Sequence, residues 1–274
     1  MGKLVLGTVQ FGLQYGVNSA GRPSEDTVRD ILSAAWAGGI DTLDTSSAYG
    51  NAEEVLGRCV TQPFKQVSKY PKGDIPVREC FEGSLCRLGT DRLYGYLLHH
   101  FELYRAHPDI WEDFLALKDA GKVQKIGFSL YDSSELELIL ENGVPFDLLQ
   151  FPFNFFDRKF QPYMEQLHRR GVEIHVRSTF LQGLFFKDRS MLPEKLQPLR
   201  KYLLELDAYA RESGLGVGEI ALNYNLQHPF IDGVLIGVDN LEQLQVNLRS
   251  VRSEPIQLDI HVLEQELLNP VNWN

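Results

Sequence analysis

Short hydrophobic runs alternate along this chain with longer segments in which apolar residues recur every three or four positions. Short apolar runs bounded by turn residues are typical of buried strands, and the longer periodic segments are typical of amphipathic helices. The pattern predicts strands at residues 3–8, 40–46, 64–70, 92–100, 123–129, 146–151, 172–178 and 231–238. It predicts helices at residues 24–39, 52–60, 76–89, 109–122, 132–143, 159–171, 197–214, 217–228 and 240–251.

Regular alternation of strands and helices favours parallel pairing through right-handed crossovers. Eight such units close a (β/α)8 TIM barrel, and 274 residues is an ordinary length for one. The competing fold is an open doubly wound sheet, which usually carries a G-x-G-x-x-G turn after its first strand. The glycines of LGTVQFGLQYG lack that spacing, so we expect the barrel. No linker interrupts the chain, and we expect one domain over residues 1–274.

Polar side chains follow the predicted strands, at the end of a parallel barrel where catalytic residues lie. Asp44 and Tyr49 come at or just after the end of the strand at 40–46. Lys69 lies at the end of the strand at 64–70, and His99 at the end of the strand at 92–100. An acid, a phenol, an amine and an imidazole together can protonate a carbonyl oxygen while it receives a hydride.

This set, in its order and local contexts, resembles the aldo-keto reductase family over nearly the whole chain, from LGTVQFG to EQLQVNL. The resemblance implies NAD(P)H-dependent reduction of an aldehyde or ketone, or the reverse oxidation, with Tyr49 as the proton donor. It implies that Lys69 lowers the pKa of the phenol and that Asp44 holds Lys69 charged. It also implies that His99 donates a hydrogen bond to the substrate oxygen.

The histidine at this position has a neighbour of the same type, His100. Consecutive residues of a strand point to opposite faces, so we expect only one of the two to face the barrel interior. Alignment with the family pattern favours His99, and His100 is the alternative.

The resemblance further implies a set of cofactor contacts at strand ends and in the last helix. These are Gly7, Thr8, Ser129, Gln150, Arg177, Gly183, Gln243 and Asn247. Ser129 and Gln150 match positions that hydrogen-bond the nicotinamide amide. Arg177 replaces an aromatic ring that many members stack on the nicotinamide. Gly183 lies in a loop along the pyrophosphate, where glycine allows close approach of the backbone.

The implied cofactor is NADP, with NAD possible. Gly237 and Gln243 stand where many NADP-dependent members carry Lys and Arg, which weakens the usual preference. Arg249 in the last helix is a candidate to replace those cations, although Asn247 and Arg249 do not share a helix face. We therefore expect any preference to lie within about tenfold, or 1.4 kcal/mol.

The predicted first strand begins almost at the start of the sequence. The N-terminal hairpin that closes the barrel floor in many members of the family is therefore expected to be missing. We expect Met1 or the terminal LNPVNWN (residues 268–274) to cover the floor instead.

Composition narrows the remaining possibilities. The net charge of −10 argues against a nucleic-acid partner, which would require a basic surface. Three cysteines without metal-ligand spacing, Cys59, Cys80 and Cys86, favour a reduced chain without a metal site. No apolar stretch reaches the length of a membrane span. We expect a cytoplasmic protein whose partner is a small carbonyl compound.

Two other functions stay open at this point. In a lyase of another barrel class, Lys69 would form a Schiff base with the substrate, which requires its pKa to be lowered by burial or by a like charge. The third candidate is a non-catalytic relative that binds the cofactor as a regulatory subunit.

Overall fold

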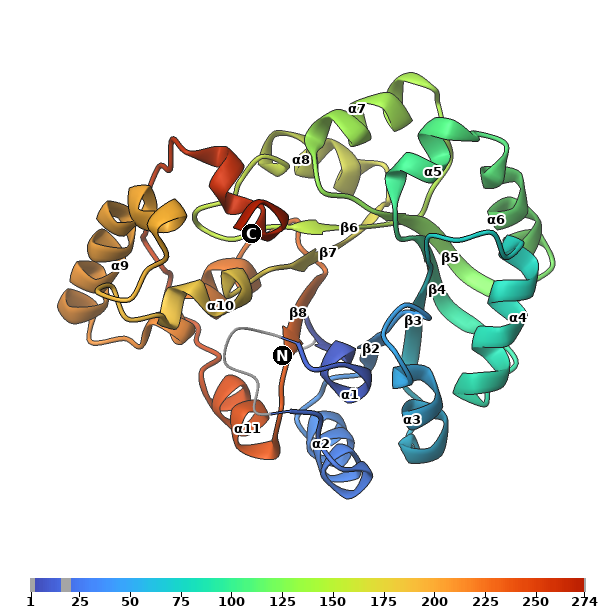
Figure 1. Cartoon of the computed structure of the whole chain (residues 1–274), viewed down its shortest axis with the longest axis horizontal. Coiled ribbons are helices and arrows are strands. Elements are labelled where there is room, and N and C mark those ends of the chain that lie inside the picture. Colours follow the sequence, from blue (N-terminus) through green and yellow to red (C-terminus); the bar gives the residue numbers. More distant parts are fainter. Residues whose placement is uncertain (1–2, 16–20, 274) are drawn as a thin grey trace.

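The structure is a computed structural model of the chain and describes residues 3–15 and 21–273. Its strands pair in parallel and in sequence order, and the last pairs with the first to close a barrel (Figure 1). The predicted (β/α)8 barrel is confirmed. The strands are β1 (Leu4–Gly7), β2 (Thr42–Asp44), β3 (Lys65–Tyr70), β4 (Leu93–Leu98), β5 (Val123–Ser129), β6 (Leu148–Pro152), β7 (Glu173–Arg177) and β8 (Gly233–Gly237).

Helices surround the barrel, and every helix that the sequence pattern predicts is present. The α-helices are α1 (Val9–Gly12), α2 (Glu25–Ala37), α3 (Ala52–Cys59), α4 (Val77–Leu88), α5 (Phe101–Ala106), α6 (Ile110–Asp119), α7 (Ser133–Glu141), α8 (Gln161–Arg169), α9 (Arg200–Ser213), α10 (Val217–Leu226) and α11 (Leu241–Arg249). The 3₁₀ turns are η1 (Leu181–Phe186), η2 (Glu194–Leu199), η3 (Gln265–Leu268) and η4 (Pro270–Trp273). The short helices α1 and α5 and the 3₁₀ turns η1, η3 and η4 have no counterpart among the predicted elements, while η2 overlaps the start of the helix predicted at 197–214.

The helix ends follow from local side-chain chemistry. Ser24 caps α2, since its hydroxyl accepts the backbone N–H of Thr27 at 3.2 Å. Asp132 and Glu135 form a capping box at the start of α7. Helix α4 ends at Gly89, whose φ of +66° places it in the left-handed region that favours glycine.

The barrel interior is closely packed, and glycine makes this possible at two positions. A Cβ atom at Gly127 would lie 1.6 Å from the carbonyl oxygen of Leu148 on the next strand. A Cβ atom at Gly233 would lie 2.5 Å from the ring of His175. Around these glycines, an apolar layer fills the middle of the barrel. It consists of Val67, Leu97 and Leu148.

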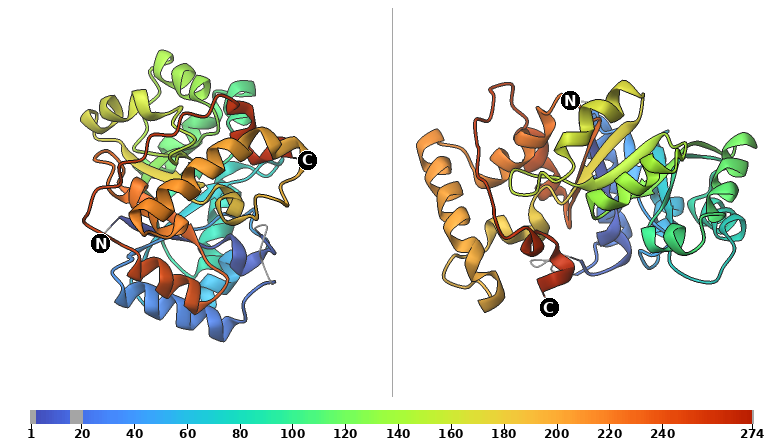
Figure 2. Two further views of the ribbon diagram at one scale, coloured as in Figure 1. Left: turned by 90° about the vertical axis from the view of Figure 1, so that its left-hand side faces the viewer. Right: turned by 90° about the horizontal axis from the view of Figure 1, so that it is seen from above.

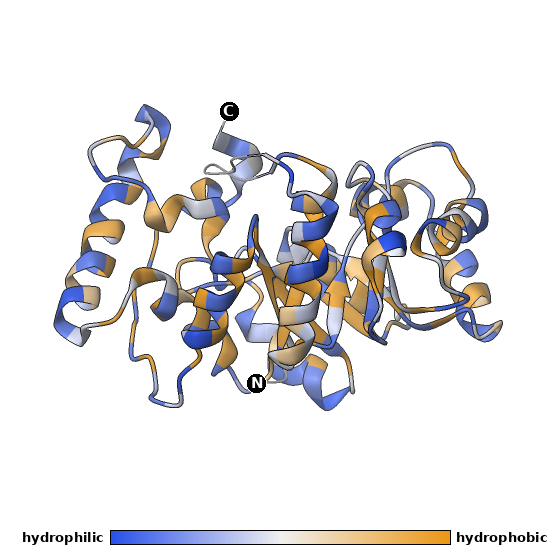
Figure 3. Ribbon diagram, turned by 90° about the horizontal axis from the view of Figure 1, so that it is seen from below, coloured by the Kyte–Doolittle hydropathy of each residue, from blue (hydrophilic) through white to orange (hydrophobic). Residues whose placement is uncertain are grey.

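A second apolar cluster lies beside the barrel, where α9 and α10 pack against η1 and the C-terminal segment (left in Figure 1). Hydropathy colouring shows the central strands as largely hydrophobic, while α9 alternates between hydrophobic and hydrophilic positions (Figure 3). Such alternation is expected of a helix that buries one face and exposes the other.

Side chains of the strands close the floor of the barrel. The ring of Tyr94 packs under the apolar layer, and its hydroxyl donates a hydrogen bond to Glu173 Oε2 at 2.6 Å. The ammonium groups of Lys65 and Lys125 lie 5.4 and 5.5 Å from the Tyr94 ring centroid. Lys125 also pairs with Glu173, and His175 Nε2 lies 2.6 Å from Glu173 Oε1. Tyr94 is thus held across the floor by a network of charged groups.

The expectation that residues 268–274 cover the floor is wrong for the described part of this segment. Asn269 and Pro270 line a cavity at the other end of the barrel, together with Asp44 and Tyr49. Figure 2 (right) shows the C-terminal segment on the opposite side of the molecule from the N mark. The sequence did not indicate that Tyr94 fills the floor. Met1, the other expected cover, lies outside the described residues.

Within the described residues, no helix combines the length and apolar character needed to cross a membrane.

Replacing Tyr94 by phenylalanine should lower the free energy of unfolding by about 1–2 kcal/mol. The change removes a hydrogen bond to a charged group, while Lys125 and His175 still pair with Glu173. Urea denaturation measures the effect. Tyr163→Phe is a matched control, because the hydroxyl of Tyr163 also bonds a carboxylate, that of Glu137, but at an exposed site. Equal losses in the two variants would contradict the role given to the floor network.

Candidate active site

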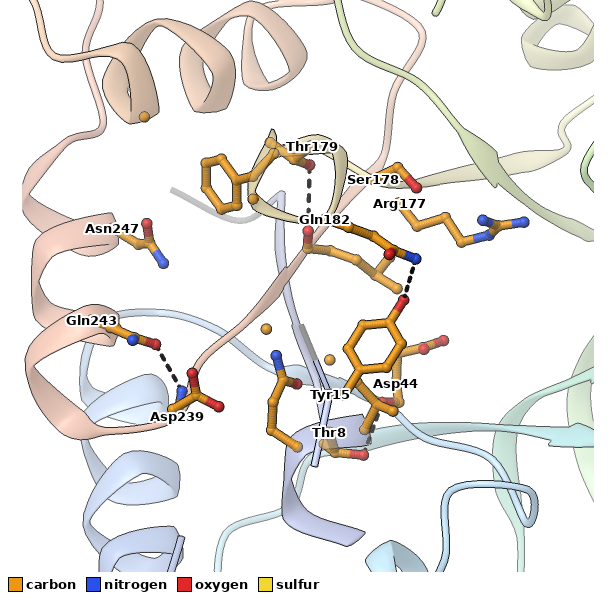
Figure 4. Close-up of a pocket in the computed structure, with 18 of the residues that line it drawn as sticks. Thr8, Tyr15, Asp44, Arg177, Ser178, Thr179, Gln182, Asp239, Gln243 and Asn247 are labelled. Atoms are coloured by element: carbon orange, nitrogen blue, oxygen red, sulfur yellow. Dashed lines mark hydrogen bonds between the residues drawn. The ribbon is translucent and has the colours of Figure 1, made fainter. Parts of the chain in front are cut away.

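A cavity of about 1190 Å³ opens at the carboxyl ends of the strands (Figure 4). Its wall includes residues at the ends of β1, β2, β6, β7 and β8, and from helices α10 and α11. Both polar and apolar groups line it, which is typical of small-molecule sites. In a parallel barrel this is the end at which active sites occur.

A buried ion pair lies at the base of this cavity. Lys69 Nζ donates to Asp44 Oδ1 at 2.6 Å and to the carbonyl oxygen of Thr45 at 2.8 Å. The side chain of Lys69 is 0% exposed and that of Asp44 is 3% exposed. Gln150 Nε2 donates to the second carboxylate oxygen of Asp44 at 2.7 Å. Burial lowers the pKa of Lys69, and the Asp44 carboxylate opposes that shift.

Tyr49 lies above this pair. The Nζ atom of Lys69 is 5.2 Å from the Tyr49 ring centroid. The position of Tyr49 depends on α1, where a Cβ atom at Gly12 would lie 1.8 Å from the carbonyl oxygen of Tyr49. Gly50, with a φ of +57°, allows the chain to turn directly after the tyrosine. Two glycines thus allow α1 and the loop after β2 to pack closely enough to hold Tyr49.

The protonation of Tyr49 differs from the expectation. Burial raises the pKa of the Tyr49 phenol, the Asp44 carboxylate raises it further, and Arg177 opposes both. The family resemblance implies the opposite, that Lys69 lowers this pKa. Lys69 does not lower the pKa of the phenol because its positive charge is paired with Asp44. The Tyr49 ring therefore faces an ion pair with no net charge. Tyr49 therefore keeps its proton at neutral pH.

His99 faces Tyr49 across the base of the cavity, with ring centroids 5.8 Å apart. Its Nδ1 atom lies 3.2 Å from the hydroxyl oxygen of Ser46, which also accepts the backbone N–H of Ala48 at 3.1 Å. The Ser46 hydroxyl donates to Nδ1 in the tautomer of His99 that carries its proton on Nε2, and accepts from Nδ1 in the other tautomer. Burial, with the nearby charge of Lys69, lowers the pKa of His99 to about 2. His99 is thus a neutral imidazole at neutral pH.

Both histidines line the cavity, which corrects the expectation that only one faces inward. Strand β4 ends at Leu98, so the alternation of strand side chains no longer applies to the two residues that follow. The rings of His99 and His100 lie 4.9 Å apart. Of the two, His99 is the one whose ring contacts Tyr49.

Most of the residues expected to contact a cofactor line this cavity. They are Gly7, Thr8, Gln150, Arg177, Gly183, Gln243 and Asn247. Ser129 does not line it; the residue is buried and pairs in register with Gln150 on the neighbouring strand. A cofactor contact from Ser129 stays a prediction. The amide of Gln150 bonds Asp44, so it connects the ion pair to the cavity wall.

The loop after β7 has an unusual backbone. Ser178, Leu181 and Gln182 have positive φ angles of 63°, 45° and 50°, followed by Gly183 at 89°. Left-handed conformations are unfavourable for residues other than glycine and concentrate at functional sites. Asn154 supports the loop, because its side-chain amide donates to the carbonyl oxygen of Ser178 at 3.0 Å. Ser178, Gln182 and Gly183 line the cavity, and a contact of this loop with a pyrophosphate stays a prediction.

The cavity also contains Gln10 and Tyr131, which no sequence motif indicated. Gln10 lines it, and its side-chain oxygen is buried with no hydrogen-bond partner among the described residues. The hydroxyl of Tyr15 accepts Gln182 Nε2 at 3.1 Å, which joins the loops after β1 and β7. Arg177 stacks on the Tyr131 ring, with the guanidinium carbon 3.9 Å from the ring centroid. No motif marks these positions, since each contact joins segments far apart in the sequence.

The cavity has room for a long ligand with both polar and apolar parts. Its wall runs from Asp44 and Tyr49 to Gln243 and Asn247 on α11. The side-chain oxygen of Gln10 on α1, which has no hydrogen-bond partner among the described residues, offers an acceptor in this wall. Within the described residues, no cluster of His, Cys, Asp and Glu side chains has the arrangement of a metal site.

Comparison with known proteins identifies the family. The model of the aldo/keto reductase family matches residues 3–264. The chain belongs to the aldo/keto reductase family. Among relatives, the uncharacterised oxidoreductase YrpG of Bacillus subtilis (strain 168) is 24% identical over 98% of this chain and 91% of that protein. L-glyceraldehyde 3-phosphate reductase of Escherichia coli (strain K12) is 22% identical over 88% of this chain and 85% of that protein.

Solved structures show the same fold. The holo form of the aldo-keto reductase AKR11C1 from Bacillus halodurans has a TM-score of 0.73 and 22% identity, over 97% of this chain and 90% of that chain. A putative aldo-keto reductase from Pseudomonas aeruginosa has a TM-score of 0.68 and 22% identity, over 90% of this chain and 88% of that chain. This aldo/keto reductase is therefore an oxidoreductase by family and a (β/α)8 barrel by fold.

The buried, neutral state of His99 predicts a pH-dependent stability. Its folded pKa of about 2 lies below the ordinary value near 6.5, so between these values only the unfolded chain binds the proton. Stability should therefore fall as the pH falls below about 6.5, by about 2 kcal/mol between pH 7 and pH 5 from this group. Urea unfolding of wild type and His99→Gln at both pH values measures the difference.

The variant His261→Gln is the control, because His261 is exposed and should leave the pH dependence of the wild type unchanged. An unaltered pH dependence in His99→Gln would show that His99 is not the group responsible.

Proposed function

We propose that this aldo/keto reductase reduces an aldehyde or ketone to the alcohol, or catalyses the reverse oxidation, with NAD(P)H as cofactor and Tyr49 as the proton donor. The observation that carries the proposal is the buried Lys69–Asp44 pair beneath Tyr49, with neutral His99 across from it, at the base of the cavity. When bound, the nicotinamide supplies the hydride. The residues that would hold the cofactor are Gly7, Thr8, Gln150, Arg177, Gly183, Gln243 and Asn247, with Ser129 implied by family resemblance alone.

The first task of the protein is to hold and polarise the carbonyl oxygen. In this proposal His99 carries its proton on Nε2 and Nδ1 accepts from the Ser46 hydroxyl, so that the neutral imidazole donates a hydrogen bond to the substrate oxygen without giving up the proton. The pKa of His99, near 2, keeps it from becoming charged beside Lys69. His99 thus orients the substrate oxygen within reach of Tyr49.

The second task is to deliver a proton as negative charge develops on that oxygen. The raised pKa of Tyr49 keeps the phenol protonated and ready to donate. An alkoxide is a stronger base than a phenolate, so the proton still moves downhill. The phenolate that is left lies over the ammonium group of Lys69, which stabilises it in a cavity of low polarity. Asp44 keeps Lys69 in place and offsets the cost of burying it.

Because the family more often uses NADP, we propose NADP as the first candidate for the cofactor and NAD as the second. The proposed substrate is a small carbonyl compound, and the aromatic side chains of Tyr15, Tyr131 and Phe186 at the cavity wall favour one with an apolar part. A cytoplasmic location stays a prediction.

Replacing Tyr49 by phenylalanine should lower kcat by roughly 10²–10⁴-fold and leave cofactor affinity nearly unchanged. The hydroxyl acts on the substrate oxygen, while the rest of the side chain keeps its packing. Steady-state rates with 4-nitrobenzaldehyde and several other aldehydes measure the loss, and fluorescence titration measures cofactor affinity. Wild-type turnover in the variant would rule out Tyr49 as the proton donor.

Lys69→Met should also abolish reduction. Because removal of one partner from a buried pair costs about 3–5 kcal/mol, the double variant Lys69→Met with Asp44→Asn provides a control with no unpaired buried charge. We expect both variants to bind cofactor and neither to turn over. The Schiff-base reading predicts instead that borohydride traps a substrate on Lys69 in the wild type. Lys69 is 0% exposed and does not line the cavity, so mass spectrometry should find no adduct.

A further inference from the structure

The cavity has two ends with different side chains. Asp44 and Arg177 lie at the catalytic end, while Asp239, Gln243 and Asn247 lie at the other, on α11 and just before it (Figure 4). We refer to the second region, Asp239 to Asn247, as the α11 end. Under the proposed function, a dinucleotide with its nicotinamide beside Tyr49 places its adenosine at the α11 end.

Carboxylates supply the charge at the α11 end. Asp239 and Glu242 line it, and Glu219 lines the facing start of α10. Glu219 forms an ion pair with Arg252, so its charge is offset. Among the described residues that line the cavity, Arg177 is the single Lys or Arg, and it lies at the catalytic end, where it donates to the carbonyl oxygen of Leu130.

No Lys or Arg of the described residues lines the α11 end. Residues 16–20, outside the described part, read Gly-Val-Asn-Ser-Ala and contain no Lys or Arg. Arg249 is exposed, in the last turn of α11, and does not line the cavity. Because residues two apart do not share a helix face, Arg249 and the cavity-lining Asn247 point in different directions.

Hydrogen bonds hold the α11 end in this arrangement. Asn240 caps α11, since its side-chain oxygen accepts the backbone N–H of Gln243 at 2.9 Å. The backbone N–H of Asp239 donates to the side-chain oxygen of Gln243 at 2.8 Å. The loop is therefore tied to the helix, and Asp239 is held at the edge of the cavity.

These charges discriminate between the two nicotinamide cofactors. The 2′-phosphate of NADP carries close to two negative charges at neutral pH, and its recognition normally relies on nearby cations. Two carboxylates would repel it. The corresponding hydroxyl of NAD is a hydrogen-bond donor, and a carboxylate that accepts from a ribose hydroxyl is the usual device for NAD in other dinucleotide-binding folds.

We propose that the enzyme is selective for NAD(H), and that Asp239 and Glu242 set this selectivity at the α11 end. The inference rests on the proposed function, since it requires a dinucleotide in the cavity. It departs from the weak NADP preference expected from the family. The expected effect is a Kd for NADH at least tenfold lower than that for NADPH, about 1.4 kcal/mol.

Fluorescence titration of the purified protein with NADH and NADPH tests the inference without any carbonyl substrate. A preference for NADH of tenfold or more supports it. A smaller preference, or one for NADPH, overturns it and leaves the proposed function intact. Failure of both nucleotides to bind would overturn the proposed function, and this inference with it.

Substitutions assign the effect to residues. Asp239→Arg should tighten NADPH binding at least tenfold and weaken NADH binding. Glu205→Arg makes the same change of charge on α9, at an exposed residue outside the cavity lining, and should alter neither affinity. If Asp239→Arg binds NADPH no better than the wild type does, Asp239 does not set the selectivity.

Two further measurements do not depend on the folding of Asp239→Arg. In the wild type, raising the salt concentration from about 0.02 to 0.2 M screens repulsion between exposed charges, so NADPH binding should tighten relative to NADH binding. Weaker binding of NADPH at the higher salt concentration, relative to NADH, would indicate that a cation attracts the 2′-phosphate and would overturn the inference. Arg249→Ala should leave NADPH affinity unchanged, and a tenfold loss would identify Arg249 as the phosphate ligand and overturn the inference.

Discussion

The ion pair between Lys69 and Asp44 is the interaction on which the rest of the site depends. Both side chains are removed from water, and loss of either partner would leave a buried charge, at a cost of about 3–5 kcal/mol. The pair has two further partners: Lys69 donates to the carbonyl oxygen of Thr45, and Asp44 accepts from the amide of Gln150. These contacts fix a cation under the ring of Tyr49 while leaving no open path from the cavity to the amine.

The pair also explains the electrostatics of the cavity base. A neutralised ion pair does little to ionise the phenol, so burial dominates and Tyr49 stays protonated. The same cation, with burial, keeps His99 neutral. Under the proposed function, Tyr49 keeps its proton until negative charge develops on the substrate oxygen, and His99 serves as a neutral hydrogen-bond donor. At the other end of the cavity, the carboxylates that line it are those of Asp239 and Glu242, with Glu219 on α10, whereas a phosphorylated cofactor would call for cations.

Much of this could be predicted from the sequence. The alternation of strands and helices indicated the barrel. The positions of Asp44, Tyr49, Lys69 and His99 at or near strand ends indicated that these residues lie at one end of it. Local patterns did not reveal contacts between distant segments: Tyr94 closing the floor through Glu173, or Gly12 packing against the carbonyl of Tyr49. The prediction that only one of His99 and His100 faces inward was wrong because β4 ends at Leu98, and the exact end of a strand depends on tertiary contacts. The predicted direction of the pKa of Tyr49 was wrong because the burial of the phenol also depends on tertiary contacts.

Isotope transfer tests the central claim most directly, since it follows the hydride itself. NADH and NADPH labelled with deuterium on the transferred position of the nicotinamide would each be incubated with wild-type protein and 4-nitrobenzaldehyde. Mass spectrometry of the alcohol would then show whether the label has moved. We expect an alcohol that carries deuterium at the former carbonyl carbon. Formation of no alcohol, or of an unlabelled alcohol with both cofactors, would rule out hydride transfer from the nicotinamide to the carbonyl carbon.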